Sequence, residues 1–169
     1  SHAASILKRL YTLFFFRPKK RKSIVYTYDF LEEASRMGVR TTYLSKSESN
    51  LFGLISTFID HSELPDGALL LTPYLNFRQL ISSKKGKDYK ERNLNDIIEN
   101  SAEKQFILLG DDSQGDLRSY SNVAKSHKNK IKAILIRKTG FGMNEEKLKF
   151  MKTIRDLGIE TIYFSDEDD

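Results

Sequence analysis

Short apolar runs that alternate with helical stretches constrain this chain more than any other feature. Five such runs are long enough for one strand each, at residues 39–44, 68–72, 105–109, 131–136 and 160–164. Runs that are apolar at nearly every position suit strands buried on both faces. The pattern therefore predicts an α/β fold of the Rossmann-like kind, in which a parallel sheet is flanked by helices.

Helices are expected between these strands, at residues 50–61, 90–99, 117–126 and 145–157. Ahead of the first strand, apolar residues at helical spacing predict an amphipathic helix at 5–16 and a second helix at about 26–37, which ends at Gly38. A basic loop at 17–23 would separate the two. Neither an internal repeat nor a long linker divides the sequence. We therefore expect one domain over residues 1–169, with residues 1–38 as a helical and basic segment before the strands.

Polar residues at the carboxyl ends of the strands are the candidate ligand site, because parallel sheets bind their ligands there. Ser45 follows the first strand, Lys90 opens the helix before the third strand, and Asp111, Asp112 and Asp116 follow that third strand. A hydroxyl and an ammonium group can hold phosphate oxygens, and carboxylates can hold Mg²⁺. The set therefore favours a site for phosphoryl chemistry.

Each of these residues also has a simpler interpretation. Asp111 or Asp112 would cap the helix after the third strand, and Ser45 would cap the helix at 50–61. Lys90 would be a solvated surface lysine. Only their order along the sheet joins these residues into one site, so both interpretations stay open at this point.

Charge and composition limit the partners and the compartment. Five positive charges crowd into residues 17–22, namely Arg17, Lys19, Lys20, Arg21 and Lys22, and they suit an anionic membrane surface or a solvated loop. The helix at 5–16 would lie on lipid or pack against the sheet. Nucleic acid is not expected as a partner, because no nucleic-acid motif is present. Cysteine is absent, which allows a reducing compartment, and no stretch approaches the ~20 apolar residues of a membrane span. We expect a cytoplasmic protein, with a peripheral position on a membrane as the open alternative.

A block from 105 to 137 carries the most specific pattern in the chain. It reads Gln-Phe-Ile-Leu-Leu-Gly-Asp-Asp over 105–112, continues through Asp116 and Tyr120, and ends in Ala-Ile-Leu-Ile-Arg at 133–137. Tyr-Leu-Ser-Lys-Ser at 43–47 and the segment at 64–73 accompany it. Together these segments resemble the actin-patch-protein type of phosphatidate phosphatase, which is related to the lipin phosphatases. The resemblance covers roughly residues 40–137.

The resemblance implies a haloacid dehalogenase fold and Mg²⁺-dependent hydrolysis of a phosphate monoester, phosphatidate. By position, Ser45 would contact the phosphate and Lys90 would be the lysine of the third family motif. Asp111 would hold the metal, with Asp116 as its supporting carboxylate. The chain departs from the family near Ser45, where Glu48 replaces a proline and the family's tryptophan is missing. A glutamate near the phosphate would repel an anionic substrate.

The nucleophile motif of the family, Asp-x-Asp-x-Thr, is absent from this sequence. Its first aspartate attacks phosphorus and its second is the general acid–base. The only aspartate before residue 60 is Asp29, and the motif normally precedes a helix like the one at 5–16. We therefore expect the motif upstream of Ser1 and the 169-residue chain itself to be inactive. The alternative is a relative that lost the motif and serves as a binding or scaffold domain.

The strand that carries this motif lies in the middle of the haloacid dehalogenase sheet. It would stand between the strands that end at Ser45 and at Gly110. Without it, we expect two unpaired edges that the chain must repair or that further polypeptide must fill.

Overall fold

The computed structural model describes residues 21–72, 83–112, 115–140 and 142–165. In chain order the elements are α2 (Arg21–Arg36), β1 (Thr41–Glu48), a short 3-10 helix η2 (Ser49–Leu51), α3 (Phe52–His61), β2 (Gly67–Thr72), α5 (Ser83–Asn100), β3 (Phe106–Asp111), α6 (Asp116–His127), β4 (Ile131–Arg137), α7 (Glu145–Asp156) and β5 (Glu160–Phe164). The predicted alternation of strands and helices is confirmed. The expected helix at 5–16 and the basic residues Arg17, Lys19 and Lys20 lie outside the described residues.

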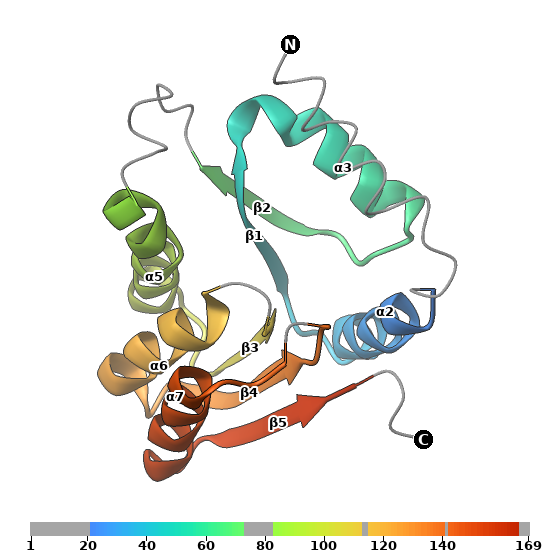
Figure 1. Cartoon of the computed structure of the whole chain (residues 1–169). Helices are drawn as coiled ribbons and strands as arrows, with labels where there is room; N and C mark the ends of the chain where they lie inside the picture. The colour runs from blue at the N-terminus through green and yellow to red at the C-terminus, as the bar shows by residue number, and fades with distance from the viewer. Residues whose placement is uncertain (1–20, 73–82, 113–114, 141, 166–169) are drawn as a thin grey trace.

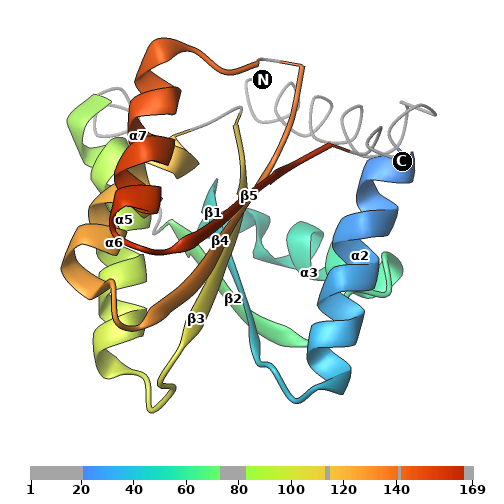
Figure 2. The same ribbon diagram turned by 90° about the horizontal axis from the view of Figure 1, so that it is seen from below.

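The strands form two parallel sheets. β1 pairs with β2, and β3, β4 and β5 form a three-stranded sheet in that order. Figures 1 and 2 show α5, α6 and α7 on one side of the strands, with α2 and α3 on the other. The predicted α/β fold, with parallel strands between two layers of helices, is therefore confirmed. The division between the sheets falls between β1 and β3.

The hydrophobic core lies where α5, α6 and α7 pack on the three-stranded sheet. Its fully buried members include Ile98 of α5, Val123 of α6, Ile134 of β4 and Ile154 of α7. Leu44 of β1 packs against this cluster from the other sheet. Burial of apolar side chains, which contributes about 25 cal/mol per Å² of apolar surface, holds the layers together. Because β4 lies in this core, its sequence is almost entirely apolar, and that composition identified the strand at 131–136.

A glycine ends α2 as predicted. Gly38 has a φ of +78°, which a residue with a side chain rarely adopts. Its N–H donates to the carbonyl of Ser35, and the N–H of Val39 donates to that of Ala34, both at 2.9 Å. This pair of bonds is the Schellman motif. The start of α2 was predicted wrongly, because the helix begins at Arg21, inside the stretch expected to be a loop.

Two further elements are longer than predicted. β1 continues to Glu48 with a register shift after Ser45, so Ser45 lies at a bulge within the strand and not in a loop after it. α5 begins at Ser83, so Lys90 lies inside this helix and not at its opening. None of the helices in the described part of the chain combines the length and the apolar character needed to cross a bilayer.

Candidate active site

Lys90 and Asp116 form a buried ion pair near the carboxyl end of β3. Lys90 projects from α5, and Asp116 is the first residue of α6. The Nζ atom of Lys90 lies 2.5 Å from Oδ1 of Asp116, and the two side chains are only 11% and 9% exposed. Burial of either charge alone would be very costly, whereas a close charge-assisted hydrogen bond makes the pair tolerable. Lys90 is therefore not a solvated surface lysine.

The other oxygen of Asp116 holds the end of β3. Its Oδ2 atom accepts a hydrogen bond from the backbone N–H of Asp111 at 3.3 Å. Gly110 makes this approach possible, because a Cβ atom there would lie 2.6 Å from Oδ2 of Asp116 and 2.8 Å from the hydroxyl of Tyr120. The glycine thus lets β3 pass close to α6 and brings Asp111 beside the ion pair.

Tyr120 supports the same strand end from α6. Its hydroxyl donates to the carbonyl of Leu109 at 2.8 Å, and Nζ of Lys90 lies 6.0 Å from its ring centre. Burial raises the pKa of Tyr120 well above its usual value, and the negative charges of Asp116 and Asp111 raise it further. Tyr120 therefore stays protonated at neutral pH and acts as a donor that fixes the backbone.

Arg137 faces Asp111 from the end of β4. The two residues are register partners, and Nη2 of Arg137 lies 3.8 Å from Oδ2 of Asp111. Both side chains are 27% exposed, so this pair is open to solvent while the Lys90–Asp116 pair is not. A guanidinium here places a second cation at this edge of the sheet, where it suits an anionic ligand.

Ser45 is linked to this cluster through neighbouring residues. Its register partner on β2 is Leu71, whose carbonyl accepts a hydrogen bond of 2.5 Å from the hydroxyl of Tyr89. Tyr89 directly precedes Lys90 on α5, and α5 packs against β1. The structure thus places Ser45 and Lys90 on adjoining elements.

Asp112 has a structural role that the sequence did not indicate. It is fully buried, and its Oδ1 accepts hydrogen bonds from the hydroxyl and, at 2.8 Å, the N–H of Thr139. Its Oδ2 accepts one of 2.6 Å from the hydroxyl of Tyr163. Burial by itself would raise the pKa of Asp112, but these hydrogen bonds and the charge of Lys147 outweigh burial and lower it. Asp112 therefore ties the end of β3 to β5 and to the residues after β4.

The interpretation of the strand-end residues as helix caps is wrong. The N-cap residue of α6 is Gly115 and that of α3 is Leu51, and neither makes a capping hydrogen bond through its side chain. Ser45 and Asp111 lie upstream of both positions, and the carboxylate of Asp112 is engaged by Thr139 and Tyr163. None of these polar residues therefore serves to start a helix.

The carboxylates here fit only one kind of Mg²⁺ site. Both carboxylate oxygens of Asp112 accept hydrogen bonds from other residues of the chain, and so do both oxygens of Asp116. In the described part of the chain no three histidine, cysteine, aspartate or glutamate side chains come together as a metal cage. Mg²⁺ is nevertheless often held by one or two carboxylates together with water and phosphate oxygens. Asp111, supported by Asp116 behind it, fits a site of that kind.

Three residues of this region were not singled out from the sequence. Arg137 is the last residue of a buried strand and Thr139 follows it, so the rule that drew attention to Asp111 could also have found them. Tyr163 carried no such signal, because it lies within β5 at the far edge of the sheet. Its partnership with Asp112 spans 51 positions and depends entirely on how the strands pack.

Comparison with known proteins adds one finding. The family model described as "Phosphatidate phosphatase APP1, catalytic domain" matches residues 1–138, well over half of the chain. The matched segment includes Ser45, Lys90, Asp111 and Asp116, and it ends just after Arg137. No curated protein and no solved structure shows a significant match.

Proposed function

Because the chain belongs to the family of phosphatidate phosphatase APP1 catalytic domains, we propose that it supplies most of the active site of a Mg²⁺-dependent phosphatidate phosphatase with the haloacid dehalogenase fold. The reaction would hydrolyse the phosphate monoester of phosphatidate to diacylglycerol and phosphate. The observation that carries the proposal is the buried Lys90–Asp116 pair beside Asp111 at the end of β3. A cation and a carboxylate held together at that edge suit an anionic, metal-bound ligand.

The residues of this edge would act mainly by stabilising charge. A phosphate monoester carries close to two negative charges at neutral pH. An ammonium group has three donors, of which Asp116 takes one, so Lys90 can also donate to phosphate oxygens. The hydroxyl of Ser45 would donate to another oxygen. Mg²⁺ beside Asp111 would neutralise part of the same charge. Because Asp116 fixes Lys90 in advance, no reorganisation is needed when the reaction occurs.

The proposed nucleophile is the first aspartate of an Asp-x-Asp-x-Thr motif, which this sequence does not contain. Its carboxylate oxygen would bond to phosphorus while the bond between phosphorus and the diacylglycerol oxygen breaks. The second aspartate would give that leaving oxygen a proton, and water would then hydrolyse the aspartyl-phosphate. In this scheme the 169-residue chain is inactive by itself and turns over substrate only when the motif is joined to it.

A catalytically inactive binding or scaffold domain is the second candidate function. The absence of the aspartate motif from the sequence favours it, because Lys90 and Ser45 could hold an anionic headgroup without cleaving it. Glu48, which replaces a family proline close to Ser45, would weaken the binding of any phosphate there. Turnover after the motif is supplied separates the two candidates.

The proposed setting is the cytoplasmic surface of a membrane, where a lipid substrate would be met. Arg17, Lys19, Lys20, Arg21 and Lys22 would attract anionic headgroups. Arg21 and Lys22 open α2, and the other three residues lie outside the described part of the chain.

The test compares the 169-residue chain with the same chain joined at its N-terminus to a strand that ends in Asp-x-Asp-x-Thr. Phosphate release from a short-chain phosphatidate is measured with Mg²⁺ and with excess EDTA. We expect release only from the joined protein and only with Mg²⁺. A joined protein with asparagine at the first motif position controls for contaminating phosphatases. If the joined protein is folded by circular dichroism and releases no phosphate, the scaffold candidate is favoured.

A further inference from the structure

Arg137 ends β4 beside Asp111, and the contact between the two side chains is open and loose. Nη2 of Arg137 lies 3.8 Å from Oδ2 of Asp111. That distance exceeds the roughly 2.7–3.2 Å of a hydrogen bond between nitrogen and oxygen. Both side chains are also 27% exposed, and ion pairs that water can reach are weak. A stronger partner for either group can therefore replace this contact.

The ion pair of Lys90 and Asp116 differs in both respects. Its nitrogen–oxygen distance is 2.5 Å, and its side chains are only 11% and 9% exposed. The second oxygen of Asp116 also accepts the backbone N–H of Asp111. Separation of these two charges would leave each of them buried without a partner, which is very costly. Of the two cations near Asp111, Lys90 is therefore fixed, whereas Arg137 is able to change its partner.

The guanidinium of Arg137 has unused hydrogen-bond donors. It carries five N–H groups in a planar fork, and such a fork can bind two oxygens of one phosphate group at once. Among the described residues its one ion-pair partner is Asp111, and the guanidinium makes no hydrogen bond within that part of the chain. Most of the fork is therefore available to an anionic ligand at the ends of β3 and β4.

A divalent cation and Arg137 would compete for the same carboxylate. Asp111 is the residue of this edge that fits such a cation, and two positive charges a few ångströms apart repel each other. Asp112 offers Arg137 no alternative, because Thr139 and Tyr163 already donate hydrogen bonds to both of its oxygens. A cation that binds Asp111 would therefore displace the guanidinium toward an anion at the same edge.

We propose that Arg137 is a phosphate-binding residue that exchanges partners. In the free protein its guanidinium neutralises Asp111. When a divalent cation binds Asp111, the guanidinium leaves this carboxylate and donates two hydrogen bonds to the phosphate group of the ligand. No covalent bond changes in the exchange. The inference rests on the proposed function, because it requires a cation at Asp111 and a phosphate group beside it.

The exchange couples the binding of the two ligands. Without phosphate, Arg137 competes with the cation and weakens its binding to Asp111. A phosphate group draws the guanidinium away from Asp111, so the cation then binds more tightly. By linkage, the cation must favour the binding of phosphate by the same factor. Arg137 would thus keep the affinity for the cation low until a phosphate ester is present.

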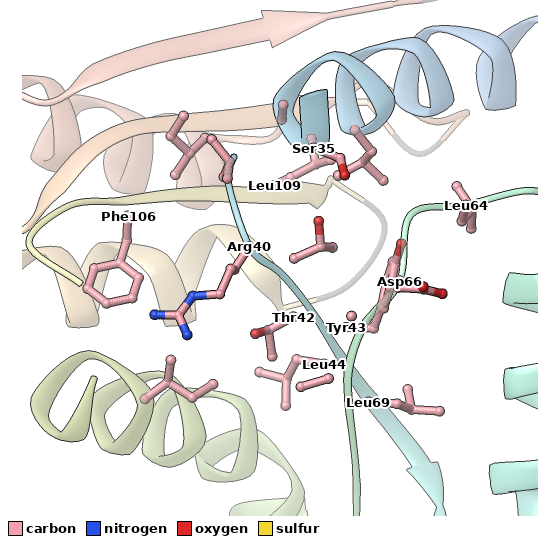
Figure 3. A pocket seen from close by; sticks show the side chains of 18 of the residues that line it. Ser35, Arg40, Thr42, Tyr43, Leu44, Leu64, Asp66, Leu69, Phe106 and Leu109 are labelled. Atoms are coloured by element: carbon pink, nitrogen blue, oxygen red, sulfur yellow. The ribbon is translucent and has the colours of Figure 1, made fainter. Parts of the chain in front are cut away.

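The cavity between the two sheets is a poorer place for a phosphate group. Residues 40–45 and 105–109 border this mostly apolar space, and its charged lining residues in the described part of the chain are Arg40, Asp66 and Glu103. Arg40 donates to Glu103, and Figure 3 shows Arg40 on the side of Phe106, with Asp66 on the opposite side. One cation stands against two carboxylates there. The phosphate group is therefore expected beside Arg137 and not in the cavity.

The test measures two affinities of the joined protein and of its variants, and neither requires turnover. Mn²⁺ binding is followed without phosphate by the electron paramagnetic resonance of free Mn²⁺. Binding of inorganic phosphate is measured by calorimetry at saturating Mg²⁺. For Arg137→Met we expect Mn²⁺ to bind about fivefold more tightly, because a competing charge is gone. Phosphate should bind about tenfold more weakly, because the fork is gone.

Lys138→Met is the matched control for the loss of one positive charge. Lys138 is the next residue along the chain, but its ammonium group lies over the ring of Tyr163, 5.3 Å from the ring centre. Both affinities of this variant should stay near those of the parent. Arg137→Lys keeps the charge without the fork, so it should bind Mn²⁺ like the parent and phosphate more weakly. If circular dichroism shows that Arg137→Met is unfolded, Arg137→Gln replaces it.

A purely structural role of Arg137 predicts a different result. Arg137→Met would then be slightly less stable and would keep both affinities, which would overturn the inference. Weaker Mn²⁺ binding by this variant would also overturn it, because the guanidinium would then support the cation site instead of competing for it. Opposite shifts of the two affinities in a joined protein without turnover would leave the exchange standing and contradict the proposed enzymatic function. Turnover with unchanged affinities would do the reverse.

Discussion

The ammonium group of Lys90 lies 2.5 Å from a carboxylate oxygen of Asp116, 26 positions further along the chain. The second oxygen of the same carboxylate accepts the backbone N–H of Asp111. One buried side chain therefore positions both a cation and the end of β3. A substitution of either member of the ion pair should therefore also disturb the position of the carboxyl end of β3.

Replacing Lys90 by Met should destabilise the protein strongly, because it leaves the buried carboxylate of Asp116 unpaired. We expect a loss of about 3–5 kcal/mol in the free energy of unfolding, measured by urea denaturation at pH 7. Lys152→Met is the matched control, because Lys152 pairs with Asp156 on an exposed surface of α7. That variant should lose less than about 1 kcal/mol.

The double variant Lys90→Met/Asp116→Asn separates charge from packing. It keeps a side-chain oxygen that can accept the N–H of Asp111 but contains no buried charge. It should be more stable than Lys90→Met alone. An equal or greater loss of stability in the double variant would show that packing around Lys90, and not its charge, dominates.

Replacing Gly110 by Ala should disturb the site directly. The added Cβ atom would meet Asp116 and Tyr120, and neither can move freely, because Lys90 and the carbonyl of Leu109 hold them. We expect destabilisation of about 1–3 kcal/mol. Gly53→Ala in α3 is the control, because no atom beyond its chain neighbours and its own helix backbone lies within 4 Å of its Cβ position. That change should be neutral or stabilise the helix by up to about 1 kcal/mol. Similar thermal midpoints for the two variants would contradict the close packing at Gly110.

The hydrogen bond from Tyr163 to Asp112 predicts a pH dependence in the alkaline range. Burial and the bond and charge of Asp112 raise the pKa of Tyr163 to about 12, against an unfolded value of 10.0. A raised pKa contributes stability that is complete below pH 10 and is lost as the pH rises toward 12. Tyr163→Phe should therefore show a shallower loss of stability over this window than the parent.

The same ionisation can be followed by absorbance at 295 nm, where only tyrosinate contributes because the chain has no tryptophan. Tyr163→Phe should lack a component that titrates near pH 12 in the parent. An unchanged titration curve would show that Tyr163 does not ionise separately from unfolding.

The basic residues at 17–22 should matter only at a membrane surface. Changing Lys19, Lys20, Arg21 and Lys22 to Gln should weaken the action of the joined protein on phosphatidate in anionic vesicles, by about 1 kcal/mol per charge near the surface. Hydrolysis of a soluble phosphate ester should not change. As a control, the exposed residues Lys125, Lys128, Lys132 and Lys149 are changed to Gln in the same background. If both quadruple variants lose the same activity on phosphatidate in vesicles, the residues at 17–22 are not a specific membrane-docking segment.

Local sequence was sufficient for most of the fold. β5 was predicted with its observed bounds and β4 within one residue, because both are short apolar runs with clear turn or helix neighbours. The early starts of α2 and α5 were missed. Those first turns are rich in Lys and Arg, which favour helices but give no apolar periodicity. The bulge in β1 was missed because it depends on pairing with β2.

The candidate site was only partly accessible to the same reasoning. Ser45, Lys90, Asp111 and Asp116 were all found by their places relative to the strands, and the resemblance gave each of them a role. The spacing of residues along the sequence could not predict that Lys90 pairs with Asp116. It also could not predict that Asp112 has a structural role. Asp111 is the last residue of β3 and Asp112 is the first residue after it, and the two side chains have different partners. Only the packing of β4 and β5 decides which of them is used internally.

That contrast provides the most direct measurement of the central claim, that Asp111 belongs to a phosphoryl site. Phosphate release by the joined protein is measured as a function of Mg²⁺ concentration for Asp111→Asn and for Asp112→Asn, below the unfolding temperature of each. Asp111→Asn removes a negative ligand, so half-maximal activity should require at least tenfold more Mg²⁺, with partial recovery of the rate at high concentration. Asp112→Asn should lower stability but keep the Mg²⁺ dependence of the parent. Identical Mg²⁺ dependence in the parent and in Asp111→Asn would contradict the account.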